Sequence, residues 1–497
     1  MRQQKKSLPS SRTKKTFVAQ SVTLTQALDE APLSLFHIRA FLTSGMGFFT
    51  DAYDLFIIGI AMTLIKDQWH LSISQVGLLG SATLLATLAG AFVFGRIADV
   101  LGRKAVYGLE AAIMALAAIA SAFAPNFLWL FIFRFILGLG IGGDYPVSGV
   151  IMSEYSNKNN RGQLVSLVFS MQALGLVIGP VVALTLLSLG IDHNIAWRLM
   201  LGLGALPALS IIYLRRTLPE SPRFVARVHG DLQKAAASIA AYSHGVVQVS
   251  KHLEPKVSTN LKHFFKQKRN LLMLVGTAGS WFLLDYAYYG NTISSPLIFK
   301  AVAPHAVLVQ SVAWSLVVFA IAAAPGYVLA FLSIDRIGHR KLQWMGFLAM
   351  GICFALIGLI PGIVHNVLPF IIIYGLSYFF TEFGPNVTTF VIPTEVFSVS
   401  GRATGHGIAS GIGKLGAFVG VFAFPLLTAK FGLSGTLLLS SGFAFAGALL
   451  TRILPEPSGK TLDEVSPDYQ MIQTEMTQVA LVKSPALTHT SRGKKRK

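Results

Sequence analysis

The chain has 497 residues, of which 53% are apolar and only 13% are charged, whereas an ordinary soluble domain carries about 25% charged residues. This composition excludes a water-soluble enzyme or binding module. The net charge of +19 would suggest nucleic acid in a soluble protein, but here it fits a membrane protein that keeps its basic residues on the cytoplasmic side.

Long apolar runs follow one another along the chain, and a membrane-spanning helix needs about 20 such residues. Six predicted spans cover residues 40–64, 75–101, 105–123, 127–153, 163–189 and 196–214. Six more cover residues 270–298, 307–334, 342–361, 367–393, 403–428 and 433–454. We therefore predict an all-α polytopic membrane protein with twelve transmembrane helices in two six-helix bundles.

The spans divide the chain into five parts: an N-terminal tail (1–37), a six-helix bundle (38–214), a central loop (215–269), a second six-helix bundle (270–455) and a C-terminal tail (456–497). The loop, which begins with Arg215 and Arg216, is basic, and so are both tails. Because cytoplasmic segments retain Lys and Arg, we expect the loop and both termini in the cytoplasm and the bundles in a cell membrane, plasma or inner.

One loop motif occurs in both predicted halves. The segment Asp335 to Lys341 after the eighth span repeats the Asp–Gly spacing of the segment Gly95 to Lys104 after the second span. Repeated bundles around a site at the membrane midplane are typical of transporters. We expect cytoplasmic charge contacts that break and re-form as the halves rock, unless these residues are simply solvated. The four residues concerned are Asp99, Arg103, Asp335 and Arg340.

Ionisable side chains within the spans cost about 2.5 to 3.5 kcal/mol each on insertion scales, so they usually mark a transport pathway. Asp51 and Asp54 are three residues apart and share a helix face. Like charges this close disfavour double ionisation, so we expect one carboxyl to pick up and release a proton. The alternative is a structural pair satisfied by a neighbouring helix. The other candidates are Arg134, Asp144, Asp285, Glu382 and Lys414.

Polar and aromatic residues accompany three of these groups. Asp144 and Tyr145 follow a glycine-rich run, whose glycines suit close helix packing. Trp281, Asp285 and Tyr289 recur every four residues and line one stripe. A buried carboxylate in that stripe needs hydrogen-bond donors, which argues against aromatic packing alone. Lys414 lacks the phosphate-loop pattern, so it would either clamp an anion or pair with an acid.

These motifs resemble those of the phosphate:proton symporter family of the major facilitator superfamily. The resemblance covers residues 47–464 and is strongest at 47–56, 142–146, 281–285 and 383–386. It implies proton handling by Asp51, Asp54 and Asp144, with Arg134 near them. It also implies phosphate contacts from Tyr145, Gln172, Trp281, Asp285, Tyr289, Asn386 and Lys414.

Three departures from the family pattern stand out. Glu382 occupies a position that is usually Asn, His339 replaces an Arg, and residues 398–400 lack the usual Pro and Arg. Glu382 could add a proton site or narrow the choice of substrate.

The residues also suggest how coupling would work. If Asp51, Asp54, Asp144 and Asp285 were ionised against Arg134 and Lys414, the cavity would repel an anion. Proton uptake would then favour anion binding, and anion binding would favour protonation. An ionised Asp285 would accept a hydrogen bond from a P–OH group, which sulfate lacks near neutral pH.

The sequence thus predicts a proton-coupled symporter that imports inorganic phosphate by alternating access. Its expected partners are phosphate, protons and the lipid bilayer, with no nucleic acid, enzyme activity, cofactor or metal. Two alternatives stay open: a major facilitator transporter of sugars or organic anions, and a nutrient sensor that transports nothing.

Overall fold

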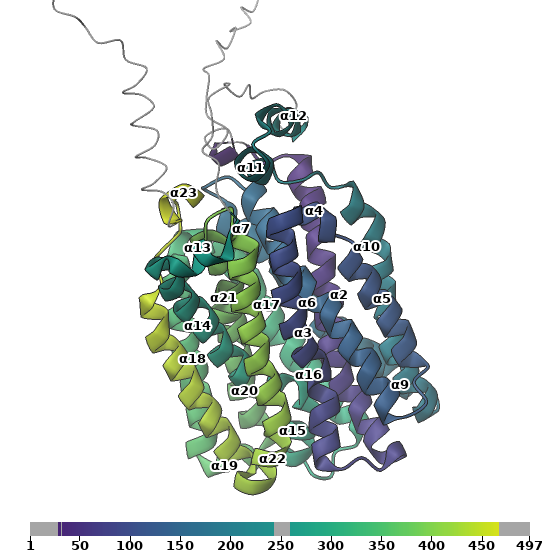
Figure 1. Cartoon of the computed structure of the whole chain (residues 1–497). Coiled ribbons are helices and arrows are strands. Elements are labelled where there is room, and N and C mark those ends of the chain that lie inside the picture. Colours follow the sequence, from purple (N-terminus) through teal and green to yellow (C-terminus); the bar gives the residue numbers. More distant parts are fainter. Residues whose placement is uncertain (1–27, 31, 243–258, 467–497) are drawn as a thin grey trace, which may run out of the picture.

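The computed structural model describes residues 28–30, 32–242 and 259–466, and in this part of the chain every regular element is a helix. Most of the predicted tails 1–37 and 456–497, and residues 243–258 of the central loop, lie outside the described residues. Two groups of helices lie side by side (Figure 1), and they correspond to the two halves of the sequence.

The first half contains six membrane-length helical stretches, three of them divided in two by a short irregularity. They comprise α2 (Leu35–Trp69), α3 (Ile73–Leu101), α4 (Arg103–Val106) with α5 (Leu109–Ala122), α6 (Phe127–Tyr155), α7 (Arg161–Ser170) with α8 (Gln172–Ser188), and α9 (His193–Gly202) with α10 (Ala205–Thr217).

The second half repeats this organisation. It comprises α14 (Lys268–Ile293), α15 (Ser295–Val302), α16 (Leu308–Val318) with η2 (Phe319–Ala323) and α17 (Ala324–Ile337), α18 (His339–Leu359), α19 (Pro361–Val364), α20 (Val367–Phe383) with α21 (Pro385–Val396), α22 (Arg402–Leu450) and η3 (Thr451–Ile453).

Eleven helical stretches of the described chain are long and apolar enough to span a membrane, and the last of them, Arg402–Ile453, contains two spans. Gly432 interrupts α22 with φ 70° and ψ 175°, which is not helical. The chain turns back there, so that the hydroxyl oxygens of Thr428 and Thr436 lie 3.3 Å apart. The prediction of twelve membrane helices is confirmed.

Short helices between the halves gather at one end of the bundle, named the loop end below. They are α11 (Pro222–Phe224), η1 (Val225–His229), α12 (Leu232–Tyr242) and α13 (Leu261–Lys266), joined there by α23 (Leu462–Val465). The second and eighth spans end at this side with Gly102 and Gly338, whose φ values of 101° and 96° disfavour any residue with a Cβ. The repeated loop motif therefore has the same backbone geometry in both halves.

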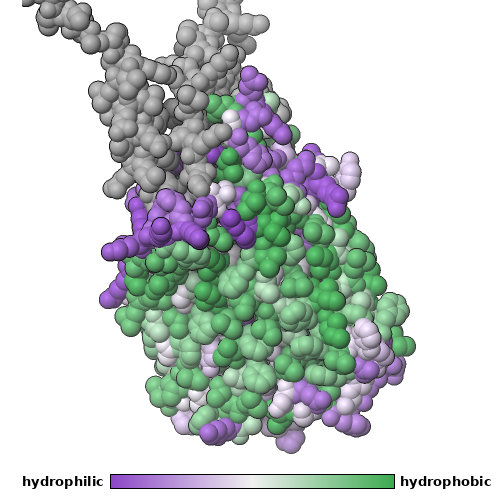
Figure 2. Space-filling view, in the orientation of Figure 1, coloured by the Kyte–Doolittle hydropathy of each residue, from purple (hydrophilic) through white to green (hydrophobic). Residues whose placement is uncertain are grey.

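The outside of the bundle is apolar. Figure 2 shows hydrophobic residues over the middle of the molecule and hydrophilic residues concentrated at the loop end, with a smaller group at the opposite end. Leu116 and Ile321 are 68% and 72% exposed. Such a large apolar surface suits contact with lipid rather than water.

Small residues bring α14 and α22 into close contact near the centre. A Cβ added to Gly416 would overlap the carbonyl oxygen of Phe282, and one added to Gly420 would overlap the backbone of Tyr286. Small residues allow helix backbones to approach in this way inside a membrane. The close approach places Lys414 of α22 beside the polar stripe of α14.

Candidate functional site

Seven buried polar and aromatic residues from both halves meet at the centre of the bundle, and each is at most 2% exposed. The structure thus brings together the whole set that the family resemblance implied for phosphate. The set is Tyr145 from α6, Gln172 from α8, Trp281, Asp285 and Tyr289 from α14, Asn386 from α21 and Lys414 from α22.

Lys414 is the cation of this central site. Its Nζ donates to Oδ2 of Asp285 and to the hydroxyl of Tyr289, both at 2.8 Å. The same ammonium lies 4.1 Å from the ring centroid of Tyr289 and 4.9 Å from that of Tyr145. The Trp281 ring closes the group, with its centroid 6.0 Å from that of Tyr145. Lys414 is therefore held by an acid and by aromatic faces at once.

A chain of hydrogen bonds continues from Tyr145 into the second half. Gln172 donates from Nε2 to the Tyr145 hydroxyl at 3.2 Å and accepts at Oε1 from the Tyr327 hydroxyl at 3.1 Å. Asn386 then donates from Nδ2 to the Tyr327 hydroxyl at 2.8 Å and to Oε2 of Glu382 at 2.5 Å. Gln172 and Tyr327 thus join the two halves directly.

Aromatic rings enclose the central site from both ends. Toward the loop end, Phe48 and Phe169 of the first half pack on Phe390 of the second half, with centroid separations of 4.9 and 4.5 Å. Toward the opposite end, Phe56 stacks on Tyr289 at 5.6 Å. A substrate between these layers would be shielded from water on both sides.

A second cluster lies within the first half, where Asp51, Asp54, Arg134 and Asp144 are fully buried. Nη1 of Arg134 lies 3.7 Å from Oδ1 of Asp54, and its Nη2 donates to the Asp54 carbonyl oxygen at 2.5 Å. Asp144 accepts from the Ser148 hydroxyl at 2.5 Å. The carboxyl oxygens of Asp51 and Asp54 accept no hydrogen bond among the described residues, but Asp54 is paired with Arg134, whereas Asp51 has no ion pair there.

Arg215 completes this cluster; it was predicted as the first residue of the central loop 215–269, but it belongs to α10. α10 continues to Thr217 and buries the Arg215 side chain completely. Its Nη2 donates to Oδ2 of Asp144, and its Nη1 donates to Oε1 of Glu110, both at 2.8 Å. Gly47, one turn before Asp51 on α2, lies against the Asp144–Arg215 pair, since a Cβ there would overlap both side chains.

Three candidate functional residues were therefore not predicted from the sequence, namely Glu110, Arg215 and Tyr327. Glu110 could have been found, because it is an acid within the predicted third span. Tyr327 gave no signal, because a tyrosine in an apolar run is common. Together the two clusters hold six carboxyl groups, on Asp51, Asp54, Glu110, Asp144, Asp285 and Glu382, and three basic groups, on Arg134, Arg215 and Lys414.

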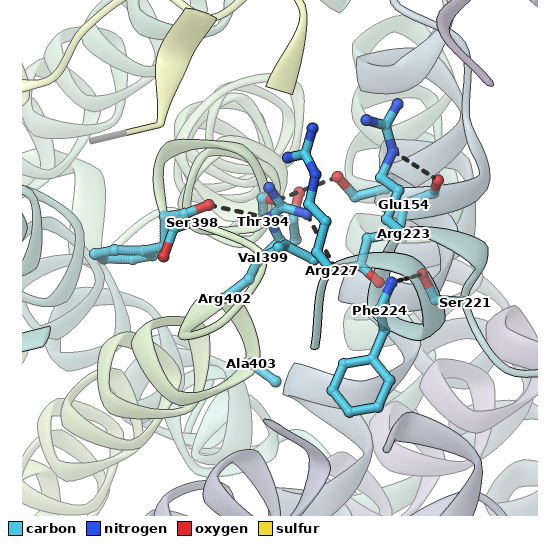
Figure 3. Close-up of polar contacts among 12 residues, drawn as sticks. Glu154, Ser221, Arg223, Phe224, Arg227, Thr394, Ser398, Val399, Arg402 and Ala403 are labelled. Atoms are coloured by element: carbon cyan, nitrogen blue, oxygen red, sulfur yellow. Dashed lines mark hydrogen bonds and ion pairs between the residues drawn. The ribbon is translucent and has the colours of Figure 1, made fainter. Parts of the chain in front are cut away.

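Charged residues also connect the two halves at the loop end. Nη2 of Arg103 lies 3.2 Å from Asp99 and 3.1 Å from Glu154, and it donates to the carbonyl oxygen of Val399 at 3.0 Å. Arg402 of the second half donates to the same Glu154 oxygen at 3.0 Å. Figure 3 shows Glu154 and Arg402 with Arg223 and Arg227 of the central loop around them.

The matching region of the second half differs in detail. Oδ2 of Asp335 accepts from the backbone N–H of Gln163 in the first half at 2.7 Å, whereas Arg340 donates to the Leu454 carbonyl oxygen in its own half at 3.2 Å. His339 lies 3.5 Å from Glu456. Burial alone would raise the pKa of Glu456, but its hydrogen bond to His339 and the charge of that ring lower the pKa to about 2. Glu456 therefore stays ionised near neutral pH.

Comparisons with known proteins place these observations in context. The family model described as "Sugar (and other) transporter" matches residues 40–469. The chain is 36% identical to the probable inorganic phosphate transporter 1-6 of Arabidopsis thaliana over 89% of this chain and 96% of that one. It is 35% identical to the low affinity inorganic phosphate transporter 1 of Petunia hybrida over 90% of this chain and 96% of that one.

Several solved structures have an arrangement of helices similar to that of this chain. The proton:xylose symporter bound to 6-bromo-6-deoxy-D-glucose matches with a TM-score of 0.74 at 19% identity, over 87% of this chain and 98% of that chain. The xylose transporter from E. coli in a partially occluded, inward-open conformation matches with a TM-score of 0.69 at 19% identity, over 86% and 100% of the two chains. At this level of identity the likeness concerns the arrangement of helices alone.

Proposed function

The chain belongs to the sugar (and other) transporter family of the major facilitator superfamily and, within it, to the inorganic phosphate transporters, and from this premise we propose that it imports inorganic phosphate together with protons. It is a multi-pass membrane transporter, as predicted. The choice of phosphate as substrate, the coupling to protons and the alternating-access cycle are the proposal.

The observation that carries the proposal is the environment of Lys414. A fully buried ammonium lies among phenol, indole and amide donors, which suits a small tetrahedral oxyanion. Asp285, 2.8 Å from Lys414, adds an acceptor that can bind the P–OH hydrogen of phosphate. A site built to bind that hydrogen discriminates against an anion that lacks it.

The acidic cluster of the first half supports proton coupling. Arg134 neutralises Asp54, and Arg215 binds both Asp144 and Glu110. Asp51 has no such partner, so its carboxyl is the group in this half that is free to take up and release a proton. Because six carboxyl groups exceed three basic groups, an entering anion is repelled until protons bind, and this makes binding of the two ligands reciprocal.

The membrane potential sets how many protons are useful. One charge moved across 100 mV is worth about 2.3 kcal/mol. A phosphate monoanion that enters with one proton carries no net charge and gains nothing from an inside-negative potential. Uptake driven by that potential requires at least two protons per phosphate.

Alternating access would proceed by rocking of the two halves about the central site. The contacts that Asp99, Arg103 and Asp335 make across the two halves at the loop end would break when the site opens there and re-form when it closes. Arg340 was predicted to take part, but its side chain bonds within its own half and would move with it. We place that end on the cytoplasmic side of a cell membrane, with the tails 1–37 and 456–497 and the central loop that follows α10, because basic residues are concentrated there.

Replacing Asp285 with Asn is expected to lower phosphate uptake by more than about tenfold, because a hydrogen bond to a charged group contributes about 1.5 to 3 kcal/mol. The assay is uptake of radiolabelled phosphate into proteoliposomes under an inward proton gradient, with and without excess sulfate. Wild-type uptake should resist sulfate.

Thr277→Val on the same helix is the matched control, because the Thr277 hydroxyl donates only to the Met273 carbonyl oxygen of α14. This variant should transport like the wild type. Strong competition by sulfate in the wild type would contradict a phosphate-selective site. Uptake of sugars or organic anions without phosphate uptake would favour the alternative substrates.

A further inference from the structure

Glu382 is a buried carboxyl group that the proposed cycle has not used. It lies at the end of α20, where Gly384 separates that helix from α21, and it is fully buried. Its Oε2 accepts the Asn386 amide at 2.5 Å, and its Oε1 accepts no hydrogen bond among the described residues.

No cation balances Glu382 within the described chain. Of the six buried carboxyl groups, Asp54, Glu110, Asp144 and Asp285 each lie within 4.0 Å of an Arg or Lys nitrogen, whereas Asp51 and Glu382 do not. The titratable groups that face Glu382 are the phenols of Tyr288, Tyr327 and Tyr378 and the carboxyl of Asp285. An ionised carboxylate in such surroundings is costly, and a bound proton removes that cost.

The Asn386 amide connects Glu382 to the central site. An ionised carboxylate can only accept hydrogen bonds, so it holds one N–H of the amide while the Tyr327 hydroxyl holds the other. When Glu382 is protonated, its attraction for that N–H weakens, and the amide can donate to an oxygen of a bound anion instead. Protonation of Glu382 and binding of the anion therefore favour each other.

We propose that Glu382 is a second proton-binding site, which carries one proton inward with each phosphate in addition to the proton carried by Asp51. The inference rests on the proposed phosphate symport and defines its stoichiometry. The proton binds the Glu382 carboxylate from the outer aqueous phase and leaves it to the inner phase after phosphate is released. Two protons with one dihydrogen phosphate move one positive charge inward in each cycle.

The test is the voltage dependence of phosphate uptake at equal pH on both sides. Proteoliposomes take up radiolabelled phosphate with and without an inside-negative potential, which a potassium gradient and valinomycin impose. We expect the potential to stimulate the wild type severalfold. Glu382→Gln should still take up phosphate without the potential but should lose the stimulation. Thr381→Val is the matched control, since the Thr381 hydroxyl donates only to the Ser377 carbonyl oxygen of α20, and it should keep the stimulation.

Three results would overturn the inference. The first is full voltage stimulation in Glu382→Gln, and the second is phosphate uptake by the wild type that does not respond to voltage. The third is loss of phosphate counterflow in both Glu382→Gln and Glu382→Asn, which would assign the carboxyl to substrate positioning. If net uptake by Glu382→Gln is lost while counterflow persists, the proton role is supported. Absence of any phosphate uptake by the wild type would instead contradict the proposed function itself.

Discussion

Replacing Lys414 with Met is expected to weaken phosphate binding strongly. The change removes the buried cation of the central site and leaves Asp285, 2.8 Å away, as an uncompensated negative charge beside the entering anion. Truncating one partner of a buried charge pair costs about 2 to 5 kcal/mol, which is a loss of about thirtyfold to several thousandfold in affinity. The loss of affinity is measured by equilibrium binding of radiolabelled phosphate to the purified protein.

Two further variants serve as controls for the Lys414→Met measurement. Lys430→Met makes the same substitution at an exposed position of α22, and it should leave the affinity unchanged. The double variant Lys414→Met with Asp285→Asn removes both charges, so it should fold well but still fail to bind. Native affinity in the single Lys414→Met variant would show that phosphate binds elsewhere.

Replacing Arg215 with Met is expected to destabilise the whole first half. Arg215 binds Asp144 and Glu110, each at 2.8 Å, and its loss leaves two buried carboxylates without a cation. Breaking a buried pair in this way costs about 3 to 5 kcal/mol. Thermal unfolding of the purified protein in detergent should show a much lower midpoint, accompanied by a low yield of folded protein.

The next residue along the chain provides the control. Arg216 is exposed, so Arg216→Met should unfold at the wild-type temperature. Adding Glu110→Gln and Asp144→Asn to Arg215→Met removes the unbalanced charges and should recover part of the lost stability. Equal midpoints for Arg215→Met and Arg216→Met would contradict the role assigned to the buried arginine.

The fold could be predicted well from the sequence because the lipid bilayer restricts which residues a membrane-spanning segment can contain. Long apolar runs must form spanning helices, and ionisable residues within them need partners inside the protein. This rule identified Asp51, Asp285 and Lys414 from their positions inside predicted apolar spans. The repeat of loop motifs then indicated two halves with a shared central site, and the family resemblance supplied neutral members such as Gln172 and Asn386.

The remaining features depend on geometry that a linear pattern does not contain. Arg215 follows the last predicted apolar residue of its span, yet the helix continues past it and turns its side chain toward Asp144. The family resemblance implied that Arg134 lies near Asp51, Asp54 and Asp144, whereas its side chain contacts Asp54. Tyr327 is recognised as part of the site only from its hydrogen bonds to Gln172 and Asn386 in the structure. The contacts of these three residues depend on the direction of each side chain and on how the two halves pack together.

The central claim is that phosphate entry is coupled to protons, and steady-state accumulation tests it most directly. Wild-type proteoliposomes would be given an inward proton gradient with the membrane potential shunted, and dihydrogen phosphate would be determined on both sides. Coupling predicts an inside concentration well above the outside one, which collapses when a protonophore is added. Equal concentrations of dihydrogen phosphate on the two sides would contradict symport and would describe an uncoupled carrier.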